Sequence, residues 1–134
     1  MTVPVEQVAA IPLFQGLDAD TQGRVARWFD ERSYGPGQRV VTAGADGYSF
    51  YVLVGGNLSV AAPNGKVRAL RPGDFFGEIS MIGGGRRSAM ITADTEATAL
   101  EMFGTHFREL QMELPEVAAI IEEEMSRRTA RDRE

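Results

Sequence analysis

The sequence predicts a single α+β domain, mainly β, in which helices at both ends flank a central block of short strands. The 134 residues suffice for one hydrophobic core, since compact domains cluster near roughly 100–150 residues. Apolar residues recur with helical spacing in residues 5–34 and 104–130. Between them, residues 38–103 contain short alternating runs separated by Gly, Pro, Asn and Asp. We therefore expect one domain over residues 1–134.

Residues 5–34 are predicted to be helical. Asp18 is a candidate N-cap, because its carboxylate can accept hydrogen bonds from the free N–H groups of a first helical turn. Val25, Trp28 and Phe29 then follow at the i, i+3, i+4 spacing of one helix face. A Gly-Pro-Gly cluster at 35–37 marks the boundary with the strand block.

Two hairpins are predicted in the strand block. Residues 48–54 alternate along the chain, and after a Gly-Gly-Asn turn residues 58–60 place Leu and Val on one face, which is typical of a hairpin. A Pro-Asn-Gly turn at 63–65 predicts a second hairpin, because Asn-Gly tolerates the positive φ angles of a tight turn. The strand 66–70 follows this turn directly.

A further turn at residues 71–74 and strand-like runs at 89–93 and 97–102 complete the block. The total of about six or seven short strands is typical of a small barrel or jelly roll. Helical periodicity returns after residue 103, and Pro115 suits a first helical turn. An apolar stripe beyond it indicates a core or dimer face, and it consists of Val117, Ile120, Ile121 and Met125.

The composition excludes several classes of function. The chain has no cysteine, which removes disulfides, thiol nucleophiles and thiolate metal sites. Its one histidine, His106, has no companions at metal-ligand spacing, so we expect an ordinary helix-start residue and no metal site. One histidine also cannot supply the ligands of a hydrolytic or oxygenase metal centre, so we expect no catalytic residues and no enzyme.

The charge balance and the hydropathy pattern limit the partners. Fourteen basic and nineteen acidic residues give a net charge of −5, the wrong sign for binding bulk nucleic acid. The sequence offers no helix-turn-helix after its last helix, so we expect no DNA binding by this chain. It also shows no leader and no apolar run of about 18–20 residues that a membrane span needs, so we expect a cytoplasmic protein.

The segment 73–89 carries the chemistry, reading Gly-Asp-Phe-Phe-Gly-Glu-Ile-Ser-Met-Ile-Gly-Gly-Gly-Arg-Arg-Ser-Ala. Gly77 lets a ligand approach the backbone, and residues 78–82 can form a short helical turn with free N–H groups. Three glycines then let the chain return, so that Arg87 can face the same place and bind a phosphate with two N–H donors. The pattern predicts an anion site.

This segment resembles the phosphate-binding cassette of the cyclic-nucleotide-binding domain family, the type of domain in cAMP receptor protein and protein kinase A regulatory subunits. The family pattern is F-G-E followed, after some residues, by R-(S/T/A)-A, and it matches Phe-Gly-Glu at 76–78 and Arg-Ser-Ala at 87–89. The similarity includes Pro-Leu-Phe-Gln-Gly-Leu at 12–17 and Tyr-Val-Leu-Val-Gly-Gly at 51–56. It covers residues 11–125.

The resemblance implies an eight-stranded β-roll (a double-stranded β-helix or jelly roll) with N-terminal helices and with C-terminal hinge and lid helices. The cassette would occupy residues 74–91. It implies a regulatory domain that binds cAMP, with cGMP as the alternative, and that uses no cofactor. The ligand would move the C-terminal helices, and an effector protein or a second copy would read that movement. The alternative is a β-roll interaction or dimerisation module that has lost nucleotide affinity.

The resemblance also assigns roles within the site. The Glu78 carboxylate would accept a hydrogen bond from the ribose 2′-hydroxyl, and Arg87 would bind the exocyclic phosphate oxygens. Backbone amides at Gly77 and in the following turn would add donors, and the Ser88 hydroxyl would donate to the phosphate. The expected ligand-binding residues are Gly77, Glu78, Ile79, Ser80, Arg87, Ser88 and Ala89, with Arg127 and Arg128 as candidates to cover the purine.

Overall fold

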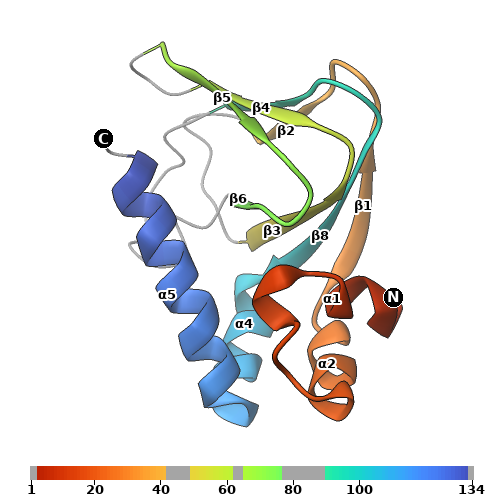
Figure 1. Cartoon of the computed structure of the whole chain (residues 1–134), viewed down its shortest axis with the longest axis vertical. Coiled ribbons are helices and arrows are strands. Elements are labelled where there is room, and N and C mark those ends of the chain that lie inside the picture. The colour runs from red at the N-terminus through yellow and green to blue at the C-terminus, as the bar shows by residue number, and fades with distance from the viewer. Residues whose placement is uncertain (1–2, 42–48, 62–64, 77–89, 133–134) are drawn as a thin grey trace.

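The computed structural model describes residues 3–41, 49–61, 65–76 and 90–132, which contain two packed antiparallel sheets and a group of helices (Figure 1). Sheet A has the strand order β1-β8-β3-β6, and sheet B has the order β2-β7-β4-β5. This architecture confirms the predicted α+β roll and its eight strands. The strands are β1 (Asp30–Tyr34), β2 (Arg39–Val41), β3 (Ser49–Gly55), β4 (Leu58–Ala61), β5 (Val67–Leu70), β6 (Phe75–Phe76), β7 (Met90–Ala93) and β8 (Ala97–Phe103).

The helices come from both ends of the chain and gather beside sheet A (Figure 1). Asp18 accepts a hydrogen bond from the Thr21 N–H at 2.8 Å, so the predicted N-cap is confirmed. Leu114 leaves the helical conformation with φ −135°, and Pro115 begins the last helix. The helices are α1 (Val5–Ala9), the 3₁₀ turn η1 (Pro12–Phe14), α2 (Ala19–Ala26), α4 (Gly104–Glu113) and α5 (Pro115–Asp132).

Two apolar clusters lie on the two faces of sheet A. Because successive strand residues point to opposite faces, Phe50 and Val52 of β3 pack against the helices, while Leu53 packs between the two sheets. On β8, Leu100 lies on the helix side and Ala99 between the sheets. The central strands β3 and β8 of sheet A are therefore buried on both sides.

Phe50 is the centre of the helix-side cluster. Its ring stacks on Phe75 of β6 at 5.7 Å between centroids, and it meets Phe29 and Phe107 edge-on at 6.1 and 6.0 Å. Such offset or edge-to-face pairs add to the free energy gained by burying the rings. The Phe50 ring thus connects Phe29, which follows the end of α2, with strand β6 and helix α4.

The prediction that residues 30–34 are helical is wrong, because α2 ends at Ala26 and these residues form strand β1. They pair antiparallel with β8, from Asp30 opposite Glu101 to Tyr34 opposite Ala97. The sequence Asp-Glu-Arg-Ser-Tyr has no apolar alternation, and its central residues are exposed. Pairing with a strand almost 70 residues later, rather than local preference, determines this element.

The predicted hairpin between residues 48–54 and 58–60 is also wrong, because β3 belongs to sheet A and β4 to sheet B. The chain passes between the sheets at Gly56, which has φ +82°. A Cβ atom at Gly56 would overlap the Glu96 carbonyl oxygen. The turn therefore approaches the β7–β8 connection closely, and the Asn57 N–H donates to Thr95 Oγ1 at 3.1 Å.

The second predicted hairpin is confirmed. Strands β4 and β5 pair antiparallel from Leu58 opposite Leu70 to Ala61 opposite Val67. The turn predicted at residues 71–74 is present as well, with Gly73 at φ +100° and the Arg71 N–H donating to Asp74 Oδ2 at 2.8 Å. The two-residue strand β6 follows it, inside the segment that the sequence analysis assigned to the cassette.

Candidate functional site

The predicted ligand-binding residues of the cassette lie outside the described residues. They are Gly77, Glu78, Ile79, Ser80, Arg87, Ser88 and Ala89. The described parts of the predicted cassette, residues 74–91, are its two ends, which contain β6 and the start of β7. These strands belong to different sheets, sheet A for β6 and sheet B for β7. The cassette residues therefore connect the two halves of the roll.

The first flank is held by backbone hydrogen bonds to β3. The Gly73 N–H donates to the Leu53 carbonyl at 2.7 Å, and the Leu53 N–H donates to the Asp74 carbonyl at 2.9 Å. Beyond this exchange, Phe75 pairs with Val52 and Phe76 with Tyr51. The residue that precedes Gly77 is thus fixed to a central strand of sheet A.

Aromatic packing fixes the same position from the side. The Tyr51 and Phe76 rings lie almost parallel, with centroids 4.9 Å apart and an interplanar angle of 7°. Phe76 is buried against the cluster between the sheets, whereas Phe75 points to the helix side. Strand β6 is therefore held on both faces immediately before Gly77.

A charged pair lies on the sheet face that also carries Tyr34 and Tyr51. Arg32 Nε donates to Glu101 Oε1 at 2.7 Å, and Glu101 is only 6% exposed. This hydrogen bond and the charge of Glu101 raise the pKa of the Arg32 guanidinium above its ordinary value. Arg32 also lies 5.9 Å from the centre of the Phe103 ring.

Tyr34, two residues further along β1, is neutral at physiological pH. Burial raises its pKa to about 12, and the neighbouring Tyr51 and Glu101 contribute in the same direction. Tyr34 and Tyr51 both pack against the apolar cluster between the sheets. The face of sheet A that carries Tyr34 and Tyr51 thus combines aromatic rings with the Arg32–Glu101 ion pair, in which the Arg32 side chain is 46% exposed.

Of the two candidate lid arginines, only Arg127 has a described side chain. It lies on α5, is 64% exposed, and approaches Glu123 one turn earlier at 3.9 Å. An exposed pair of this kind contributes little to stability, so it leaves the Arg127 side chain little restrained. The structure does not describe the Arg128 side chain, and purine contact by either residue stays a prediction.

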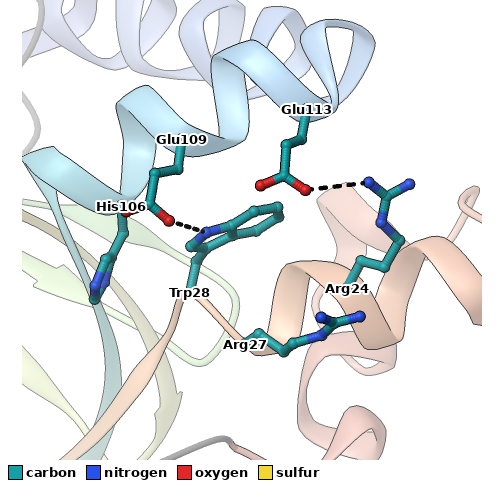
Figure 2. A pocket seen from close by; sticks show the side chains of 6 residues that line it. All are labelled: Arg24, Arg27, Trp28, His106, Glu109 and Glu113. Atoms are coloured by element: carbon teal, nitrogen blue, oxygen red, sulfur yellow. Dashed lines mark hydrogen bonds and ion pairs between the residues drawn. The ribbon is translucent and has the colours of Figure 1, made fainter.

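A polar cavity of about 290 Å³ lies between α2 and α4 (Figure 2). Its lining residues come from α2, α4 and the residues that directly follow α2, and none comes from β6 or β7. They are Arg24, Arg27, Trp28, His106, Glu109 and Glu113. This cavity is not predictable from the sequence, since the spacing of three residues on one face of α4 does not show which residues of α2 lie opposite them.

Two polar contacts cross this cavity (Figure 2). Trp28 Nε1 donates to Glu109 Oε2 at 3.1 Å, and an Arg24 guanidinium nitrogen lies 3.4 Å from Glu113 Oε1. Among the described residues no group of three or more His, Asp or Glu side chains has the arrangement of a metal site. None of the described helices has both the length and the apolar character to cross a membrane.

Comparison with known proteins gives a match to the family model "Cyclic nucleotide-binding domain" over residues 31–113. The chain is 35% identical over 126 residues to a cyclic nucleotide-gated potassium channel of Rhizobium etli, covering 94% of this chain and 34% of the channel. It is 30% identical over 102 residues to a cAMP-dependent protein kinase regulatory subunit of Colletotrichum orbiculare, covering 75% of this chain and 26% of that protein.

A solved structure shares the fold. The catabolite activator protein of Thermus thermophilus superimposes with a TM-score of 0.77 at 29% identity, covering 90% of this chain and 59% of that chain. The chain spans about a third of the length of the channel and about a quarter of the kinase subunit. What these relatives share with it is one regulatory, nucleotide-binding type of domain.

Proposed function

Because the chain belongs to the cyclic nucleotide-binding domain family, we propose that residues 1–134 form one sensor domain that binds cAMP and catalyses no reaction. The observation that carries this proposal is the cassette sequence, Phe-Gly-Glu at 76–78 and Arg-Ser-Ala at 87–89. It lies inside the matched residues 31–113. The fixed position of β6 supports it, since Glu78 follows that strand by two residues.

In this proposal the Glu78 carboxylate accepts a hydrogen bond from the ribose 2′-hydroxyl, and Arg87 binds the phosphate. The amides of Gly77, Ile79 and Ser80 and the Ser88 hydroxyl complete the phosphate contacts, and Ala89 leaves room beside them. A cyclic phosphate carries one negative charge, so one guanidinium with neutral donors balances it. The site therefore suits a monoanion better than the dianionic end of an open nucleotide.

The choice of base rests on the relatives. The kinase regulatory subunit with 30% identity is described as cAMP-dependent, which favours cAMP. Ser88 is compatible with cGMP too, because a hydroxyl at this position can contact a guanine base in the syn form. We therefore rank cAMP first and cGMP second.

We also propose that ligand binding moves α4 and α5. Two ring contacts connect the start of the cassette with α4, because Phe75 stacks on Phe50 and Phe50 meets Phe107. A shift of β6 would change the packing of α4 along this path. Arg127 or Arg128 on α5 would then cover the purine, and an effector protein or a second copy would bind the moved helices in the cytoplasm.

The test compares two neighbouring arginines by isothermal titration calorimetry with cAMP and cGMP. Arg87→Ala should weaken binding by about 2–5 kcal/mol, which is a loss of roughly 30-fold to several thousand-fold. Arg86→Ala removes the same charge one residue away and should leave the affinity close to that of the wild type. Equal losses in both variants, or none in Arg87→Ala, would contradict the assigned site.

A further inference from the structure

The cavity between α2 and α4 contains the one tryptophan and the one histidine of the chain (Figure 2). Trp28 is 8% exposed, and its indole N–H donates to Glu109 of α4. This hydrogen bond joins α4 to the segment that follows α2. A second contact, between Arg24 and Glu113, crosses the cavity one turn further along α4.

His106 lies one turn before Glu109 on α4, and its Nδ1 atom is buried without a hydrogen-bond partner among the described residues. The ring meets Phe103, the last residue of β8, edge-on at 5.8 Å. A buried polar nitrogen without a partner is destabilising. The cost is larger for an imidazolium, in which both ring nitrogens donate and the ring carries a charge.

The positive and negative charges of the side chains around His106 balance one another while its ring is neutral. Arg24 and Arg27 face the cavity from the α2 side, and Glu109 and Glu113 face it from α4. On the β-sheet side, Arg32 of β1 lies over the Phe103 ring and is paired with Glu101. A second proton on His106 would thus add one uncompensated positive charge.

We propose that His106 and Glu109 form a proton-operated contact between the N-terminal and C-terminal helices. With His106 neutral, the Glu109 carboxylate accepts a hydrogen bond from the Trp28 indole N–H. This hydrogen bond joins α4 to the residues that follow α2. When His106 gains a proton, its Nδ1–H needs an acceptor, and Glu109 is the carboxylate at the i+3 position of the same helix face. Glu109 then turns toward His106 and the Trp28 hydrogen bond weakens.

Helix geometry allows Glu109 to change its hydrogen-bond partner from Trp28 to His106. Side chains three residues apart on a helix are neighbours, with Cβ atoms about 5–6 Å apart. The other charged groups that line the cavity are the guanidinium groups of Arg24 and Arg27, which repel an imidazolium, and Glu113, which already faces Arg24.

Because Trp and His each occur once in the chain, proton and nitrogen NMR of the uniformly ¹⁵N-labelled wild-type chain reports both partners without residue-specific labels. The Trp28 indole N–H and the His106 ring signals are followed from about pH 8 to about pH 5. We expect the indole proton to move upfield as its hydrogen bond weakens, with the midpoint at which His106 titrates. An indole signal that stays constant while His106 titrates would overturn the proposal.

Two variants test the coupling. In His106→Gln the indole shift with pH should be lost, and in Glu109→Gln His106 should still titrate while the indole signal stays constant. Glu116→Gln, an exposed acid at the start of α5 outside this cavity, should behave like the wild type. An indole transition that persists in His106→Gln would overturn the proposal, and should that variant not fold, the two wild-type midpoints decide. No nucleotide is added, so the result is independent of the proposed function.

Discussion

At the scale of single residues, Tyr34 shows how the roll determines the chemistry of a side chain. It lies at the end of β1, opposite Ala97 of β8, and packs against the cluster between the sheets. Burial raises its pKa to about 12 from the ordinary 10.0. The folded state therefore holds the phenolic proton more tightly than the unfolded chain does.

This difference predicts a loss of stability in alkali. Below pH 10 the Tyr34 contribution is fully present, and it is lost as the pH rises from 10.0 towards about 12, because the unfolded chain ionises first. Denaturant unfolding across this range should show a steeper decline for the wild type than for Tyr34→Phe, which keeps the ring and cannot ionise. Parallel declines of the two proteins would contradict this assignment.

At the scale of elements, the structural features that were predicted correctly from the sequence are local ones. The Asp18 cap and the Asn-Gly hairpin each depend on residues within a few positions of one another. Strand β1 and the crossing between β3 and β4 could not be predicted, because each depends on β8 or the β7–β8 connection far along the chain. The residues of a polar strand such as Asp-Glu-Arg-Ser-Tyr do not indicate which distant strand it pairs with.

Two adjacent glycines test the crossing between the sheets. Gly56→Ala should lower the free energy of unfolding by about 2 kcal/mol or more, because it combines a positive φ with a clash against the Glu96 carbonyl. Gly55→Ala meets no atom within 4 Å and should change stability much less. Urea unfolding of both variants gives the comparison, and equal effects would show that the close approach at Gly56 is not restrictive.

At the scale of the whole molecule, sheet A separates two environments. Its helix side holds the Phe50 ring cluster with α4 and α5, and its other side holds the second apolar cluster between the two sheets, with Tyr34 and Tyr51 packed against it. The cassette residues join this sheet to sheet B at β7. The ring contacts Phe75–Phe50 and Phe50–Phe107 connect strand β6, at the start of this segment, with α4.

The proposed switching predicts a change in hydrogen exchange over residues 103–128. Saturating cAMP should alter the exchange of α4 and α5, because the ligand changes how these helices pack against sheet A. Arg87→Ala at the same nucleotide concentration is the control and should show no change. Identical exchange in the wild type with and without cAMP would contradict movement of these helices.

The candidate site is predicted from the sequence alone, since its ligand-binding residues lie outside the described part of the chain. The cassette is a continuous motif between residues 76 and 89, so one short segment carries its chemistry. The Tyr51–Phe76 stack and the Trp28–Glu109 hydrogen bond join residues that are 25 and 81 positions apart. Such contacts depend on the complete fold, which no local pattern of residues describes.

The central claim, nucleotide binding, is tested most directly by calorimetric titration of ligand-free wild-type protein with cAMP and, as the matched ligand, with 5′-AMP. Refolding removes nucleotide that remains bound from the expression host. We predict saturable binding of cAMP at one site per chain with micromolar or tighter affinity, and much weaker binding of the open dianion. No saturable binding of cAMP or cGMP to the refolded protein would contradict the account and favour an interaction module that has lost nucleotide affinity.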